Sequence, residues 1–194
     1  PAQRLCVLGL GAVGRVLGEE LAFAGYRVNG WSPRLELPLS EAGPANPPLA
    51  PNLRFEAKID AALAGASAVL ICVRDAAIAE LAERVSGLVA EGARPVVLHT
   101  SGFHGPERLA RLAELGMPVG VLHPLTAVPR GAGRMRPRLG ETRYLRGVWF
   151  ALNGDPEACR VAREIVSALG ARPLVLEGGA EGQALYHAAA ALLS

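Results

Sequence analysis

The chain has 194 residues, of which 51% are hydrophobic, and its 20 Lys and Arg against 18 Asp and Glu leave a net charge of +2. This length suits one domain, or one domain and the start of another. The apolar content excludes a disordered protein, and no apolar run approaches the roughly 18 residues that would span a bilayer. The near-neutral charge balance gives no case for a nucleic-acid or membrane partner.

Short β-rich runs alternate with segments of helical period along the chain, which predicts a parallel sheet covered by helices. The predicted strands span residues 4–8, 26–31, 53–55, 68–73, 95–99, 119–123, 147–152 and 173–176. The predicted helices span residues 12–24, 59–63, 76–90, 106–115 and 155–169, and a last helix begins near residue 181. The expected fold class is therefore α/β, a Rossmann-type doubly wound and mainly parallel sheet with helices on both faces.

Two long loops interrupt this alternation. Residues 32–51 contain six prolines, a density that excludes helix interiors and central strands. Residues 130–146 contain six Arg and one Glu. Because Arg suits phosphate, this second loop could close over a phosphorylated ligand, but the favoured interpretation is a solvated mobile loop.

Three cysteines, Cys6, Cys72 and Cys159, are an odd number and lie far apart, and two of them sit in apolar runs. This pattern predicts buried free thiols and a reducing, cytoplasmic setting. The chain opens without a basic and then apolar leader, so we expect no secretory signal. The helix predicted from residue 181 still runs at the last residue, so we expect a continuation that is missing here.

A glycine motif follows the first predicted strand and opens the first predicted helix. Its G-x-G-x-x-G pattern is made of Gly9, Leu10, Gly11, Ala12, Val13 and Gly14. In a dinucleotide site the first glycine permits the turn, the second lets the pyrophosphate approach, and the third lets helix and strand pack closely. The phosphates then meet the free N–H groups of the helix N-terminus. We therefore favour dinucleotide binding over a structural turn.

The end of the second strand bears on which dinucleotide is bound. An NAD site usually places an acidic residue there for the ribose hydroxyls, whereas this stretch has no acid before Glu36. Ser32 can donate a hydrogen bond and Arg34 can supply a forked cation to a 2′-phosphate. The pattern favours NADP(H) over NAD(H), although Arg34 could instead face water.

Three of the four histidines, His99, His104 and His123, lie at the ends of two neighbouring predicted strands. Histidine can act as a general acid near neutral pH, and Ser101 or Thr126 could hold a carbonyl, imine or carboxylate oxygen. A structural role for each histidine stays open. A hydrolase pair of His99 and Ser101 is disfavoured because no G-x-S-x-G elbow surrounds the serine. A metal site from the histidines is disfavoured because no recognisable ligand spacing accompanies them.

The combination of motifs resembles a family of Rossmann-like oxidoreductases that pair an N-terminal NADP-binding domain with a C-terminal helical domain of unassigned function. More distantly, the chain looks like pyrroline-5-carboxylate reductases, deazaflavin-dependent NADP reductases and the 6-phosphogluconate dehydrogenase-like superfamily. Besides the glycine turn, the resembling stretches are residues 73–75, 99–102, 123–125, 153–155 and 186–190.

The resemblance implies that nicotinamide lies beside Val73, Arg74 and Thr100, at the ends of the fourth and fifth strands. Arg74 departs from relatives, which often have proline there. The resemblance also implies a catalytic polar residue from the long helix of the second domain, for which we take His187.

Ser101 and His123 are then expected to orient the substrate. We divide the chain into a dinucleotide-binding domain, residues 1–176, and the start of a helical domain, residues 177–194. Domains of the latter kind interlock in a homodimer, which the resemblance implies here.

These observations favour an NADP(H)-dependent oxidoreductase that transfers a hydride between nicotinamide and a small carbonyl, hydroxyl or imine substrate. One alternative is a binding module that senses NADP(H) or another nucleotide without turnover. A second is a nucleotide-sugar or adenine-nucleotide enzyme that uses the same turn, because fold does not fix function.

Overall fold

The computed structural model describes residues 3–35, 50–129 and 144–177, together with Gly182, Leu185, Tyr186 and Ala188. Within these residues, eight strands form one sheet in the order β3-β2-β1-β4-β5-β6-β7-β8. The strands are β1 (Arg4–Leu8), β2 (Arg27–Trp31), β3 (Leu53–Phe55), β4 (Ala68–Ile71), β5 (Val96–His99), β6 (Val119–Pro124), β7 (Trp149–Gly154) and β8 (Arg172–Val175). The helices are α1 (Ala12–Phe23), α3 (Ile59–Leu63), α4 (Ile78–Ser86), α5 (Ala110–Glu114) and α6 (Pro156–Ala168), and the 3-10 turns are η1 (Pro33–Leu35), η2 (Asp75–Ala77) and η3 (Pro106–Leu109).

Strands β1 to β6 are parallel, β7 runs antiparallel to β6, and β8 is parallel to β7. The strand order reverses at β1, which lies between β2 and β4. In open α/β sheets, ligands bind outside the carboxyl ends of the strands at such a switch point. The carboxyl ends of β1, β2, β4, β5 and β6 therefore form the edge of the sheet where a site is expected.

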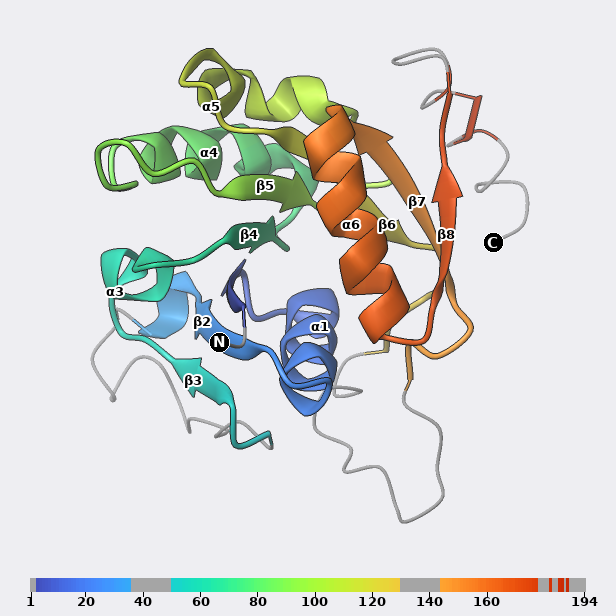
Figure 1. Cartoon of the computed structure of the whole chain (residues 1–194), viewed down its shortest axis with the longest axis horizontal. Helices are drawn as coiled ribbons and strands as arrows, with labels where there is room; N and C mark the ends of the chain where they lie inside the picture. The colour runs from blue at the N-terminus through green and yellow to red at the C-terminus, as the bar shows by residue number, and fades with distance from the viewer. Residues whose placement is uncertain are drawn as a thin grey trace.

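Helices cover both faces of the sheet. The core on one face joins the sheet to α1 and α6, and the core on the other joins it to α3, α4, η3 and α5 (Figure 1). Alternate residues of one strand serve the two cores, as β1 shows: Leu5 and Val7 pack on the first, Cys6 and Leu8 on the second. This two-sided burial explains why the central strands read as continuous apolar runs.

The expected fold class is confirmed, and most predicted elements differ from the observed ones by only a few residues. The largest difference lies after β4, where the helix predicted over residues 76–90 is a 3-10 turn, η2, followed by α4, which ends at Ser86. The strand predicted from Gly147 begins at Trp149, because Gly147 has a φ of 76° and forms the turn before it. All three cysteines are buried and free, as predicted.

Two sequence features lie partly or wholly outside the described residues. Of the Arg-rich stretch, residues 130–143 fall outside them. Of the predicted last helix, Gly182, Leu185, Tyr186 and Ala188 are helical. In the described ranges, no helix is long and apolar enough to cross a membrane.

Candidate functional site

The glycine turn is held tightly between β1, β4 and α1. Gly9 has a φ of 99°, and its N–H donates to the Trp31 carbonyl at 2.8 Å. A Cβ on Gly9 would lie 2.6 Å from the Cys72 carbonyl oxygen, and one on Gly14 would lie 1.9 Å from the Gly9 carbonyl oxygen. Both positions therefore require glycine, one for its conformation and both for the close approach of backbone.

Gly11 differs from these two glycines because no neighbouring atoms would contact a side chain at its position. Its φ of −72° suits any residue, and a Cβ added there would meet nothing within 4 Å. Gly11 is the N-cap of α1, where no side chain caps the helix and no acidic residue stands in the first turn. Ala12 and Val13 begin the first turn of α1. An anion at Gly11 would meet the N–H groups of this turn and the positive end of the helix dipole. The local structure thus fits the phosphates of a dinucleotide.

The chain turns directly after β2 into the 3-10 turn η1. The carbonyl of Ser32 accepts from the Leu35 N–H at 2.9 Å, and Arg34 in this turn is exposed. On the preceding strand, a Cβ on Gly30 would lie 2.9 Å from Leu10 Cδ2, so the glycine turn packs directly against the end of β2. Ser32 and Arg34 follow this contact, on the side of β1 away from β4.

The end of β4 adjoins the glycine turn on its other side. Val73 Cγ1 would lie 2.8 Å from a Cβ on Gly9, whereas Arg74 is exposed and is the N-cap of η2. The next strand end is tied to this one because the Thr100 N–H donates to the Ile71 carbonyl at 3.1 Å. The predicted cofactor residues therefore lie on consecutive strand ends, in the order β2, β1, β4 and β5.

His99 is locked inside the loop that follows β5. It has no exposed surface, its Nε2–H donates to the Gly105 carbonyl at 2.9 Å, and its Nδ1 accepts from the Ser101 N–H at 3.2 Å. A ring with one donating and one accepting nitrogen is neutral. Burial is the largest cause that lowers the pKa of His99 below its usual value, which also favours the neutral ring. His99 thus shapes the loop and has no ring nitrogen left for a substrate.

Ser101 is buried next to His99, yet the two do not form a nucleophilic pair. The Ser101 hydroxyl oxygen accepts from the N–H groups of Phe103 and His104, at 3.2 and 3.1 Å. The contact to His99 runs through the Ser101 backbone and not through the hydroxyl. Since both lone pairs of the oxygen are used, the hydroxyl proton is what Ser101 can offer a ligand.

His123, at the end of β6, is held by the loop of the neighbouring strand β5 and not by its own loop. Its Nδ1–H donates to the Thr100 carbonyl at 2.9 Å, which fixes the ring, and the side chain is half-buried. A Cβ on Gly102 would lie 2.6 Å from His123 Nε2, so the glycine leaves room for that edge of the ring. The ring of Tyr186 meets His123 edge to face, with centroids 6.0 Å apart.

Sequence reasoning gave Tyr186 no role, and it took Gly102 only as the last residue of the stretch 99–102. Tyr186 stood within a motif of the terminal helix, but His187 drew attention as the polar group. His187 lies outside the described residues. The Nε2 of His104 pairs with Arg108 at 3.1 Å, and no three potential metal ligands cluster in the part of the chain that the structure describes.

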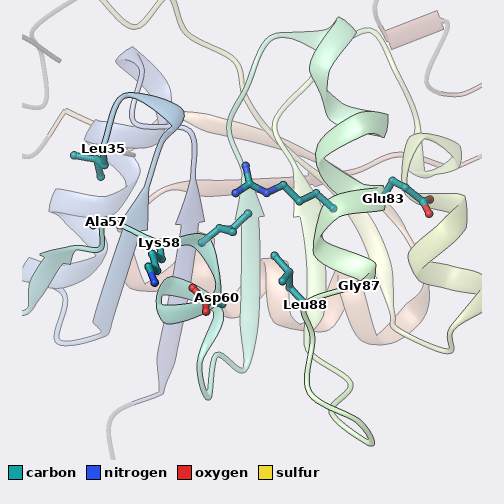
Figure 2. A pocket seen from close by; sticks show the side chains of 9 residues that line it. Leu35, Ala57, Lys58, Asp60, Glu83, Gly87 and Leu88 are labelled. Atoms are coloured by element: carbon teal, nitrogen blue, oxygen red, sulfur yellow. The ribbon is translucent and has the colours of Figure 1, made fainter. Parts of the chain in front are cut away.

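Sequence reasoning also missed a groove of about 730 Å³ on the face of α4. Figure 2 shows Lys58 and Asp60 on one side of it and Glu83 and Leu88 on the other. Arg84 lines the groove too, with its guanidinium carbon 4.9 Å from the centroid of the Trp31 ring at the end of β2. The lining comes from η1, from α3 and the two residues before it, and from α4 and the two residues after it, and no local motif would have grouped these segments.

A family model described as a Rossmann-like domain matches residues 2–124. The chain belongs to the Rossmann-like domain family. The match begins before β1 and ends with β6, so it includes the glycine turn, the loop after β5 and His123. No curated protein matches the sequence.

Solved structures resemble this Rossmann-like chain over nearly its whole length. A protein from Bacteroides fragilis solved as a candidate NADP oxidoreductase is 18% identical with a TM-score of 0.70, over 99% of this chain and 66% of that one. A reductive aminase from Aspergillus terreus, solved with NADPH and ethyl-5-oxohexanoate, is 19% identical with a TM-score of 0.65, over 100% and 60%. A Thermotoga maritima protein is 19% identical with a TM-score of 0.61, over 98% and 63%. At these identities the likeness shows the fold, and the chain spans less than two thirds of the length of each.

Proposed function

We propose that this chain binds NADP(H) along the carboxyl edge of its sheet and belongs to an oxidoreductase for small carbonyl, hydroxyl or imine compounds. The observation that carries the proposal is the open, uncapped N-terminus of α1 at Gly11, which follows β1, on the same sheet edge as the ring of His123 on β6, three strands along. The groups proposed to bind the nucleotide and to donate a proton thus share one edge. The candidate NADP oxidoreductase and the NADPH-bound aminase with the same fold support the choice of cofactor and reaction class.

Each group on this edge has a part in the proposed activity. The phosphates would lie at the N-terminus of α1, beside Gly11, Ala12 and Val13. Ser32 and Arg34 would hold the 2′-phosphate, because a hydroxyl and a forked cation suit that group. Val73, Arg74 and Thr100 would line the nicotinamide end, since they follow the strand ends between the turn and His123.

The bound nicotinamide would supply or accept the hydride. The chain's own residues would orient the substrate and manage its proton. His123, whose Nδ1–H donates to the Thr100 carbonyl, would orient the substrate. The Ser101 hydroxyl proton can bond a substrate oxygen. His187 stays a prediction from the family resemblance, as does the homodimer formed through residues after 176.

Cofactor binding tests the common premise. NADPH and NADH would be titrated against the protein, with nucleotide fluorescence and thermal unfolding as readouts. We expect NADPH to raise the melting temperature and to bind about tenfold more tightly than NADH, a difference of roughly 1.4 kcal/mol. No response to either dinucleotide at saturating concentration would exclude the proposal.

Turnover separates an enzyme from a sensor. The protein with NADPH would be offered a panel of small aldehydes, ketones, 2-oxo acids and imines, and NADPH consumption followed. Reduction of at least one class supports the oxidoreductase. Tight NADPH binding without turnover of any member would favour the nucleotide-sensing module instead.

A further inference from the structure

Tyr186 carries the strongest unexplained feature of the described structure. The residue is 8% exposed, and its hydroxyl is the one buried side-chain polar atom among the described residues that has no hydrogen-bond partner. Such an atom costs stability, because it has given up water and gained nothing in return. A buried group of this kind in a folded protein calls for an explanation, and a hydrogen bond to a substrate is one.

The position of Tyr186 points to the ligand. Its ring meets the ring of His123 edge to face, with centroids 6.0 Å apart and an interplanar angle of 77°. His123 is in turn held by the Thr100 carbonyl. The unpartnered hydroxyl therefore belongs to the same end of the sheet edge as the groups assigned above to the substrate.

The chemistry of the phenol narrows the kind of ligand. Burial raises the pKa of Tyr186 to about 12, so the hydroxyl stays protonated at neutral pH and acts as a donor. A carbonyl oxygen has lone pairs that accept such a hydrogen bond. An iminium nitrogen has none, so a phenol donor favours a carbonyl compound over an iminium ion.

We propose that Tyr186 is a catalytic residue of this site, and that its hydroxyl binds the oxygen of a carbonyl substrate and gives that oxygen its proton. This proposal rests on the function proposed above and names both a residue and a substrate class for it. As hydride adds to the carbonyl carbon, the π electrons of the C=O bond move to oxygen. The Tyr186 O–H bond breaks and the new alcohol O–H bond forms, and the phenolate then takes a proton from water.

Conservative variants of two tyrosines test this role. Tyr186→Phe removes the unpartnered hydroxyl and keeps the ring. Tyr144→Phe is the matched control, because the Tyr144 hydroxyl has a partner, the Ala127 carbonyl, at 2.5 Å. Melting temperature, NADPH affinity and reduction of a panel of aldehydes, ketones and 2-oxo acids would be measured for the full chain and for both variants.

We expect Tyr186→Phe to keep or raise the melting temperature, by up to about 4 °C, with unchanged NADPH affinity. Its turnover of carbonyl substrates should fall about 100-fold, the loss typical for a general acid. Tyr144→Phe should lower the melting temperature and leave turnover intact. A structural hydroxyl at Tyr186 would not produce this combination of a stability gain with an activity loss.

Three results would overturn the proposal. A melting temperature lowered by Tyr186→Phe as much as by Tyr144→Phe would mean that the Tyr186 hydroxyl has a structural partner. Unchanged turnover would mean that the hydroxyl does not touch the substrate. A wild-type chain that binds NADPH but reduces only imines, or nothing, would exclude the carbonyl role while leaving the cofactor site standing. Failure to bind NADPH would instead exclude the proposed function itself.

Discussion

The two halves of the sheet edge are built in different ways. On the side of β2, β1 and β4, the backbone makes the site: Gly9 and Gly14 bring strand and helix together, and Gly11 leaves an opening. On the side of β5 and β6, side chains make the site, and the Thr100 carbonyl fixes a ring 23 residues further along the chain. The first half depends on local spacing and the second on the register between strands.

The contrast is sharpest between two histidines at neighbouring strand ends. Both alternate onto the same face of the sheet, since His99 pairs with Val121 and His123 lies two residues beyond it. Both ring nitrogens of His99 form hydrogen bonds within its own loop, whereas Nδ1 of His123 forms a hydrogen bond to the loop that follows the neighbouring strand β5. Two residues of identical type and similar position thus have different hydrogen-bond partners, and the proposed role toward a substrate falls to His123.

Gly14→Ala should have the largest effect, because it attacks the half that is made by backbone. The new Cβ would lie 1.9 Å from the Gly9 carbonyl oxygen and 2.9 Å from Cys72 Cβ. Neither neighbour is the end of a flexible side chain, so we expect a loss of more than about 3 kcal/mol in the free energy of unfolding. Urea denaturation of the purified variant, or its failure to appear in the soluble fraction, measures this loss.

Gly11→Ala is the matched variant in the same turn. Its Cβ meets nothing within 4 Å and its φ is negative, so the free energy of unfolding should change by less than about 1 kcal/mol. NADPH affinity should fall at least tenfold, because the methyl group fills the opening for the phosphates. Equal NADPH affinity in Gly11→Ala and wild type would show that the phosphates do not lie there.

Gly102→Ala breaks the other half of the edge. The added Cβ would lie 2.6 Å from His123 Nε2 and 2.7 Å from its Cε1, so the ring must turn away from the Thr100 carbonyl. We expect turnover to fall about 100-fold, since general acid–base groups contribute about that much to the rate. NADPH affinity should stay within twofold. Gly87→Ala, whose Cβ would meet only the Arg84 carbonyl at 3.8 Å, is the control. A parallel loss of affinity and turnover would contradict the division into two halves.

The two halves of the sheet edge also differ in how much of them could be predicted from the sequence. The conformation of the glycine turn was predictable, because it depends on the spacing of six consecutive residues. The grouping of histidines at strand ends was predictable as well, but their different roles were not. Burial of both His99 nitrogens depends on how the chain returns at Gly105, and fixation of His123 depends on strand register. Tyr186 was missed because an aromatic residue in an alanine-rich helix is typical of plain packing.

Arg34→Ala sharpens the nucleotide half, with a smaller effect. Arg34 is exposed in η1, so its loss should leave the free energy of unfolding unchanged. We expect NADPH affinity to fall about tenfold and NADH affinity to stay the same, because only NADPH carries the 2′-phosphate. Arg54→Ala, an exposed arginine within β3, controls for a general loss of positive charge. Equal losses for the two dinucleotides would mean that Arg34 does not contact the 2′-phosphate.

The smallest expected effect is the dependence of stability on pH through His99. Burial holds the folded-state pKa of His99 below its unfolded value of about 6.5, so the unfolded chain takes up the proton first. The free energy of unfolding contributed by His99 is therefore fully present above that value and decreases as the pH falls, at up to about 1.4 kcal/mol per pH unit. The hydrogen bond to Gly105 and the carboxylates of Glu107 and Asp75 act on this pKa in the opposite direction, His104 acts in the same direction as burial, and burial is the largest cause.

Urea denaturation of wild type and of His99→Gln, at about pH 7 and about pH 5.5, isolates this contribution. Glutamine does not titrate, so the variant should lose less stability on acidification than wild type, by roughly 1 kcal/mol, even where its stability is lower at both pH values. An identical decrease in wild type and His99→Gln would show that His99 takes up its proton without unfolding. The contrast between the buried His99 and the half-buried His123 would then fail.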